Sequence, residues 1–291
     1  MLLAASLAVV LATPPGAAPA AFSPGITGAA PAAHASGPSA GPTLAIEDTL
    51  HTELPEVLVS APRVTLDEIL DRVARGEARR DSLLRDVAFT ATLRVVRGGR
   101  GGQEARLVQE TVSRVYKKKP DQVRSVTLRH WEAKRRKGEV AEMTFSSGTE
   151  EQVVNFAFRP EARRDFRYRI VGRDVMGDHV VYRIAFEPRS LVGATEPGGL
   201  VWVDTREFVI VRQELRFARS PAPLVLEGID RAVIERRQVD GHWVLHRLLV
   251  RAHFTFPMPR FGRSFDLAMT FDDYAVNRGI DDALFGSRAG R

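Results

Sequence analysis

The sequence predicts a mainly β fold: an open half-barrel of about eleven antiparallel strands with a helical lid. From Val87 almost to the C-terminus, apolar residues recur at every second position, in runs that short turns separate. Helical periodicity stands out in one segment, which begins at Thr65. Without repeated crossover helices, consecutive strands are expected to pair antiparallel.

The helix is expected over residues 65–75. Thr65 provides an N-cap and Glu68 follows three residues later, which is the spacing of a capping box. One helix face then carries the apolar residues Leu66, Ile69, Leu70, Val73 and Ala74. This stripe must pack on the sheet, and Gly76 is expected to end or weaken the helix.

The strands are expected to follow one another closely. The first contains Phe89 and Leu93. The others are expected at 104–117, 121–131, 138–145, 165–172, 178–187, 199–204, 207–218, 224–237, 242–256 and 264–275, with 151–158 left open. Several are apolar on both faces, so the sheet must be partly covered on both sides. A sheet curled around an apolar interior, with the helix as its lid, meets this requirement.

The domain is expected to span residues 63–286, after a leader and a linker. Residues 1–46 contain no Asp, Glu, Lys or Arg and open with an apolar run of about eleven residues, the size of a signal-peptide core. With Ala18 and Ala20 at a small-residue cleavage site, residues 1–20 are expected to be a signal peptide. Residues 21–62, rich in Pro, Ala, Gly and Ser, are expected to be a disordered linker. The expected location is the periplasm or cell envelope; a disordered arm on a cytosolic protein is the alternative.

Positive charge is concentrated in one segment. The net charge is +6, and residues 112–139 carry ten basic and three acidic residues, 10 − 3 = +7. This pattern indicates either a solvated hairpin or a surface for an anionic membrane or an envelope protein. The candidate residues for such a surface are Lys117, Lys118, Lys119, Lys134, Arg135, Arg136 and Lys137. They form two clusters at opposite ends of strand 121–131, roughly 40 Å apart, so a continuous nucleic-acid groove is not expected.

The sequence contains no recognisable catalytic, cofactor or metal site, so the protein is not expected to be an enzyme. The absence of Cys excludes disulfides, thiolate zinc sites and cysteine nucleophiles. His242 and His246 share a strand face, but roughly 13 Å would separate them, too far to coordinate one ion. There is no P-loop, G-x-G-x-x-G or H-E-x-x-H motif. An active site assembled from residues far apart in the sequence stays open.

Three segments resemble the LolA-like family, periplasmic carriers and sensors of lipoproteins built on an open β-barrel with a helical lid. They are VYKKKPDQVR at 115–124, LVWVD and FVIVRQE within 200–214, and NRGIDDALF at 277–285. They follow the family's order and span about residues 80–285. The same hairpin pattern occurs in RseB-like sensors, so the resemblance implies the fold more closely than the function.

The apolar interior and the resemblance together imply a periplasmic binding protein or carrier for an acyl chain, lipid or lipoprotein. The alternative is an envelope sensor or docking module that binds another protein through the basic hairpin and has a packed interior. Candidate ligand-binding residues are Phe89, Leu93, Trp202, Ile210, Trp243, Phe265, Met269 and Phe271. Alternation alone does not say which of them face inward, and ordinary core packing is the other interpretation.

Overall fold

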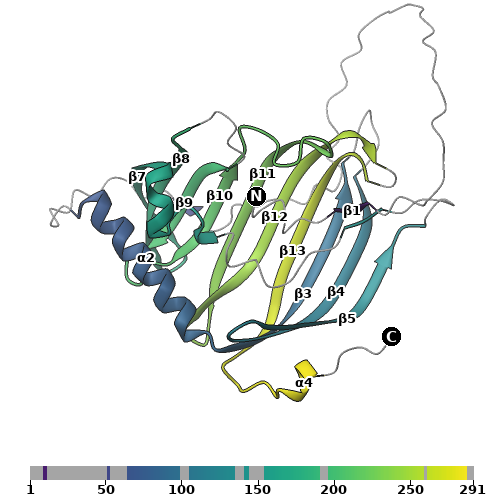
Figure 1. Ribbon diagram of the computed structural model, residues 1–291, viewed down its shortest axis with the longest axis horizontal. Coiled ribbons are helices and arrows are strands. Elements are labelled where there is room, and N and C mark those ends of the chain that lie inside the picture. Colours follow the sequence, from purple (N-terminus) through teal and green to yellow (C-terminus); the bar gives the residue numbers. More distant parts are fainter. Residues whose placement is uncertain are drawn as a thin grey trace, which may run out of the picture.

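The fold is built on one large open β-sheet, seen in a computed structural model (Figure 1). The structure describes residues 9–11, 51–52, 64–98, 105–134, 141–143, 154–190, 196–258 and 261–286. The expected leader and linker therefore lie almost entirely outside the described residues. The mainly β, open and antiparallel fold class that the sequence predicts is confirmed.

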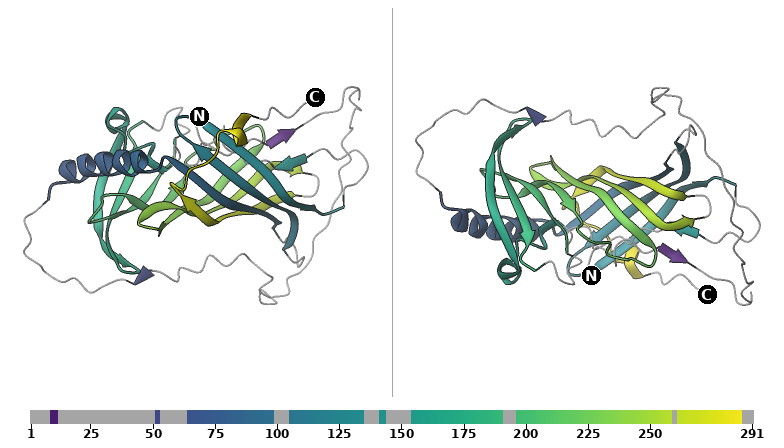
Figure 2. Two further views of the ribbon diagram at one scale, coloured as in Figure 1. Left: turned by 90° about the horizontal axis from the view of Figure 1, so that it is seen from below. Right: turned by 90° about the horizontal axis from the view of Figure 1, so that it is seen from above.

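The sheet has eleven strands in the order β2-β7-β8-β9-β10-β11-β12-β13-β3-β4-β5. All neighbours pair antiparallel. The strands are β2 (His51–Thr52), β3 (Asp86–Arg97), β4 (Arg106–Lys118), β5 (Gln122–Glu132), β7 (Phe166–Met176), β8 (His179–Pro188), β9 (Gly198–Asp204), β10 (Ile210–Arg216), β11 (Leu226–Val239), β12 (His242–Met258) and β13 (Gly262–Val276). Figure 2 shows the twist, with β7 and β8 running across the direction of β3–β5.

One expected strand lies elsewhere. In place of 138–145, the short β6 (Ala141–Met143) pairs with β1 (Val9–Leu11) in a separate two-stranded sheet. The eleventh strand of the main sheet is β2 instead. The segment left open at 151–158 forms a helical turn and turns over residues 154–158, before the short 3-10 helix η1 (Pro160–Asp165).

The main core lies between the sheet and α2 (Leu66–Leu83). Ile69, Leu70 and Val73 of α2 belong to the same buried cluster as Phe89, Ile184 and other residues from β3, β4 and β7–β13. We call this side of the sheet the core face. The opposite, outer face carries a smaller buried cluster of Val181, Trp202, Val209, Val211 and Trp243. Apolar side chains are therefore buried on both faces of the sheet, as expected from the strands whose odd and even positions are both apolar.

The helix is longer than the sequence predicts. The Thr65 side chain caps it by accepting a hydrogen bond from the Glu68 amide, as expected, but α2 continues through Gly76 to Leu83. Gly76 is buried against the β9–β10 turn. A Cβ at this position would lie 2.5 Å from the carbonyl oxygens of both Glu207 and Phe208. Gly76 thus permits a close approach of helix to backbone, and this packing offsets its weak helix propensity.

Asp204 fixes the turn that Gly76 meets. Its carboxylate is buried, and Oδ1 accepts hydrogen bonds from the amides of Arg206 (2.9 Å) and Glu207 (2.6 Å). Oδ2 lies 3.0 Å from Nδ1 of His179. Asp204 of the Trp-Val-Asp segment thus shapes the turn whose carbonyl groups, those of Glu207 and Phe208, face the helix.

Gly76→Ala is expected to lower the free energy of unfolding by about 1–3 kcal/mol, since the added methyl group must displace backbone. Helix propensity alone predicts the opposite sign, a gain of about 1 kcal/mol. Urea unfolding of the variant distinguishes the two. A stabilised variant would show that α2 does not lie this close to the β9–β10 turn.

Candidate functional site

A cavity of about 770 Å³ lies between the second half of α2, the start of β3, the β4–β5 turn, the segment before η1 and parts of β12 and β13. The volume falls within the roughly 300–1,000 Å³ of small-molecule sites. Its apolar and aromatic lining consists of Ala74, Ala78, Leu84, Val87, Phe89, Pro120, Val123, Phe158, Val244, Leu245 and Tyr274. Such a lining suits an apolar chain.

Phe89 is held within a group of aromatic rings. Its ring centroid lies 5.2 Å from that of Tyr274 and 5.7 Å from that of Phe271. The Tyr274 hydroxyl donates to the carbonyl of Leu245 at 2.7 Å, and Nζ of Lys117 lies 5.5 Å from the Phe89 ring centroid. These contacts fix the ring orientation and place a cation beside the apolar wall.

The segment before η1 forms another wall. Phe158 is buried, with ring contacts to Tyr168 (5.4 Å) and Phe186 (5.5 Å). The Tyr168 hydroxyl donates to the carbonyl of Ala157, and burial raises the Tyr168 pKa to about 12, so this donor stays protonated. Arg163 ties η1 to α2 through the carbonyl of Leu70 (2.6 Å). The wall is therefore anchored to both sheet and helix.

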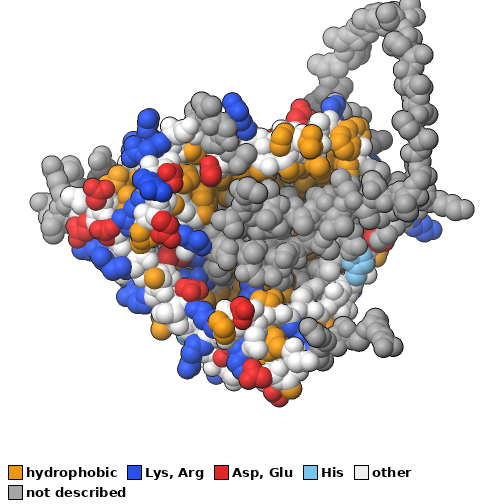
Figure 3. Space-filling model, viewed as in Figure 1, with side chains coloured by type: hydrophobic (Ala, Val, Ile, Leu, Met, Phe, Trp, Pro, Cys, Tyr) orange, Lys and Arg blue, Asp and Glu red, His pale blue; other side chains and the backbone are white. Residues whose placement is uncertain are grey.

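The charged part of the cavity lining is mostly cationic. The charged residues that line it are Arg80, Arg85, Lys117, Lys118, Lys119 and Arg159, with Glu77, Asp81 and Asp121. Figure 3 shows Lys, Arg, Asp and Glu side chains interspersed over the α2 side of the molecule. Two of the carboxylates already have partners, because Glu77 binds Arg236 (2.7 Å) and Asp81 binds Lys119 (3.0 Å). The remaining charge of the lining is positive.

The basic hairpin is partly occupied by contacts within the chain. Nζ of Lys118 binds Asp282 at 2.6 Å and the carbonyl of Ile280 at 3.0 Å. With Lys117 beside Phe89 and Lys119 on Asp81, all three lysines of this cluster have internal partners. Lys134 is exposed beyond the other end of β5, and Arg135, Arg136 and Lys137 lie outside the described residues.

The structure separates the eight predicted ligand-binding residues. Phe89, Leu93, Ile210, Phe265, Met269 and Phe271 belong to the main buried cluster, but only Phe89 of the eight lines the cavity. Trp202 and Trp243 belong to the small cluster on the outer face instead. Phe158, Tyr274, Arg85 and Arg159 line the cavity and are not among the eight predicted residues. The sequence feature that could have indicated the cavity is the pair of small residues Ala74 and Ala78, which lie one turn apart on α2 and leave space beside it.

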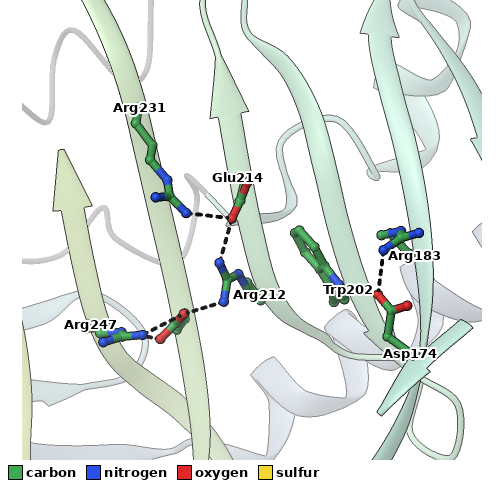
Figure 4. A network of polar contacts seen from close by, with 8 residues as sticks. Asp174, Arg183, Trp202, Arg212, Glu214, Arg231 and Arg247 are labelled. Carbon is green, nitrogen blue, oxygen red and sulfur yellow. Dashed lines mark hydrogen bonds and ion pairs between the residues drawn. The ribbon is translucent and has the colours of Figure 1, made fainter. Parts of the chain in front are cut away.

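Trp202 takes part in a polar network on the outer face (Figure 4). Its indole nitrogen donates to Asp174 (2.9 Å), which also binds Arg183 (3.2 Å), and the Arg212 guanidinium lies over the indole ring. Arg212 then binds Glu214 (2.6 Å) and Glu235 (3.2 Å). Arg231 binds Glu214, and Arg247 binds Glu235. The network links β7 to β12 and stabilises the sheet.

Glu214→Gln is expected to remove an acid-sensitive part of this stability. Burial raises the pKa of Glu214, but Arg212 and Arg231 outweigh it and hold the pKa below its ordinary value of 4.5. The stabilisation is thus present above pH 4.5 and is lost as pH falls through the lowered pKa. The Tm difference between the wild type and this variant should shrink from pH 7 to pH 3. The exposed Glu227→Gln is the control, and a constant difference would contradict this account.

The two histidines do not meet. His242 contacts the carbonyl of Asp240 through Nδ1 (2.8 Å) and the Asn277 amide through Nε2 (3.3 Å), whereas burial lowers the pKa of the half-buried His246. Over the described ranges, no group of three or more His, Asp or Glu side chains could hold a metal ion. In the same ranges, α2 and the other helices are too short or too polar to cross a membrane.

No family model and no curated protein matches the chain. Among solved structures it is similar to a DUF1329 family protein from Desulfovibrio piger (14% identity, 74% of this chain and 96% of that one, TM-score 0.37). It is also similar to a putative outer membrane lipoprotein-sorting protein domain from Vibrio parahaemolyticus (12% identity, 75% of this chain and 95% of that one, TM-score 0.39). A third similar structure is that of a LolA superfamily protein from Nitrosomonas europaea (14% identity, 77% of this chain and 98% of that one, TM-score 0.30). Its name is that of the family that the three sequence segments resemble.

Proposed function

We propose that the protein is an exported binding protein or carrier that holds an acyl chain or another lipid in the cavity beside α2. The cavity is the main support for this proposal. It has a volume of about 770 Å³, and its lining combines aromatic and aliphatic groups with several cations. An apolar chain would lie between Phe89, Phe158 and Leu245, and its removal from water would drive binding. Export to the periplasm or envelope rests on the expected signal peptide, residues 1–20.

Phe89 is the one residue of the predicted set that we retain as a ligand contact. We propose that Leu93, Ile210, Phe265, Met269 and Phe271 are packed core, and that Trp202 and Trp243 stabilise the outer face. A binding role is better supported than catalysis, since Glu77 and Asp81, two of the three carboxylates at the cavity, are in ion pairs.

Docking of another envelope protein through the basic hairpin has less support. Lys118 and Lys119 bind Asp282 and Asp81 of the same chain, so a partner would have to displace these contacts. Surface ion pairs are worth only about 0–1 kcal/mol, so displacement is feasible, but no feature of the described residues calls for it.

Ala78→Phe is expected to weaken binding of the fluorescent fatty acid cis-parinaric acid by roughly tenfold or more, because the added ring would fill space that the chain occupies. Ala78 is exposed on α2 and lines the cavity, so the fold should tolerate the ring. Fluorescence titration measures the affinity, and a thermal melt checks folding.

The matched control is Ser82→Phe, which adds a ring to an exposed position of the same helix outside the cavity lining. It should bind the probe like the wild type. If Ala78→Phe also binds like the wild type, the chain does not lie in this cavity and the proposal fails.

A further inference from the structure

We infer that the cavity selects amphiphiles with an anionic headgroup, a carboxylate or a phosphate, and that Arg85 and Arg159 bind that headgroup. This inference rests on the proposed function, because it assumes that a chain occupies the apolar part of the cavity. It adds the charge of the ligand and the residues that recognise it.

The charges of the cavity lining do not balance. Six cationic and three acidic residues line the cavity. Lys119 is neutralised by Asp81, and Lys118 by Asp282 from outside the cavity. Glu77 is engaged by Arg236, which does not line the cavity. Positive charge thus remains in the lining of the cavity.

Arg85 and Arg159 account for much of this excess. Among the described residues, no carboxylate lies within ion-pair distance of either guanidinium. The side-chain contact of Arg159 is to the neutral amide oxygen of Asn155, at 3.3 Å from Nε. Both guanidinium groups therefore have donors to offer to an anion.

The backbones of both arginines are held in place. The amide of Arg85 donates to Oδ1 of Asn277 (2.9 Å), and its carbonyl accepts from the amide of Lys119 (2.9 Å). This fixes Arg85 at the junction of α2 and β3. Arg159 follows the buried Phe158 and precedes η1, which Arg163 anchors to α2. Two anchored segments thus contribute arginines to the lining of one cavity.

The chemistry favours an anion with two or more oxygens. A guanidinium donates two parallel hydrogen bonds to a carboxylate or phosphate, which gives direction as well as charge attraction. Arg85 is exposed and Arg159 partly exposed, so neither is desolvated before a ligand arrives. The ligand would place its chain against Phe89 and Phe158 and its headgroup at the arginines.

The test is calorimetric titration of the full chain with palmitate, 1-palmitoyl-lysophosphatidic acid and hexadecanol, which share a sixteen-carbon chain. The wild type should bind at least one anionic ligand roughly tenfold or more tighter than hexadecanol. The double variant Arg85→Gln/Arg159→Gln should lose this preference and bind hexadecanol as the wild type does. If the double variant loses affinity for palmitate alone, the arginines recognise a carboxylate, and if it loses affinity for the lysophospholipid alone, they recognise a phosphate.

The control is Arg167→Gln/Arg169→Gln, which removes the same charge from exposed positions of β7 outside the cavity lining and should keep the preference. If all three ligands bind equally to the wild type and the double variant, the inference is overturned while the proposed function stands. If none of them binds to the wild type, the proposed function fails as well. A thermal melt of each variant establishes that it is folded.

Discussion

Glu77→Ala is expected to lower the free energy of unfolding by about 3–5 kcal/mol, because it removes the carboxylate that neutralises a buried arginine. Nη1 of Arg236 donates to Oε1 (2.7 Å) and Oε2 (3.0 Å) of Glu77, and the two side chains are 1% and 3% exposed. Oε1 also accepts from the amide of Ile210 at 2.8 Å. This one carboxylate therefore joins α2 to β10 and β11.

Urea unfolding with far-UV circular dichroism measures the effect. The control is Glu68→Ala, since the Glu68–Arg72 pair on the same helix is 44% and 40% exposed and should contribute no more than about 1 kcal/mol. The double variant Glu77→Leu/Arg236→Met should recover part of the loss, because it removes both charges of the buried pair while the Ile210 amide still loses its acceptor. A Glu77→Ala protein as stable as Glu68→Ala would contradict the buried pair.

Phe271→Asn is expected to destabilise the protein by about 3–5 kcal/mol, and ligand binding should be lost only to the extent that the fold is lost. Phe271 is 1% exposed, packs edge-to-face on Phe89 and does not line the cavity. A thermal melt should show a fall in Tm of roughly 10 °C. The control is Phe256→Asn, at a position 47% exposed on the adjacent β12.

The alternative outcome for Phe271→Asn is informative. If its Tm stays near that of the wild type while fatty-acid binding disappears, Phe271 lies in an open, hydrated cavity rather than in packed core. The ligand would then extend along β13 and the lining described above would be incomplete.

Much of the fold could be predicted because the apolar period follows the local backbone. Thr65 and Glu68 mark the start of α2, and strict alternation in Phe265, Leu267, Met269 and Phe271 marks β13 on the core face. The end of α2 could not be predicted, because the role of Gly76 depends on the turn at Asp204, more than 120 residues later in the sequence.

The site was harder to predict because alternation does not label the faces. Val201, Trp202 and Val203 are all buried, yet Trp202 lies on the outer face. An irregular register makes the faces harder still to assign from sequence. Ile210 and Leu215 lie an odd number of positions apart, yet both lie on the core face. The reason is that the pairing of β10 with β9 shifts by one residue between Ile210 and Arg212. The cavity walls also come from turns, where no periodicity exists.

Native mass spectrometry of the full chain, purified without detergent and mixed with palmitate, tests the central claim most directly. The wild type and Ser82→Phe should each carry the added mass of one bound fatty acid, and Ala78→Phe should show mainly the mass of the protein alone. If the wild type shows no bound palmitate, or if Ala78→Phe retains it fully, the cavity beside α2 is not a lipid-binding site.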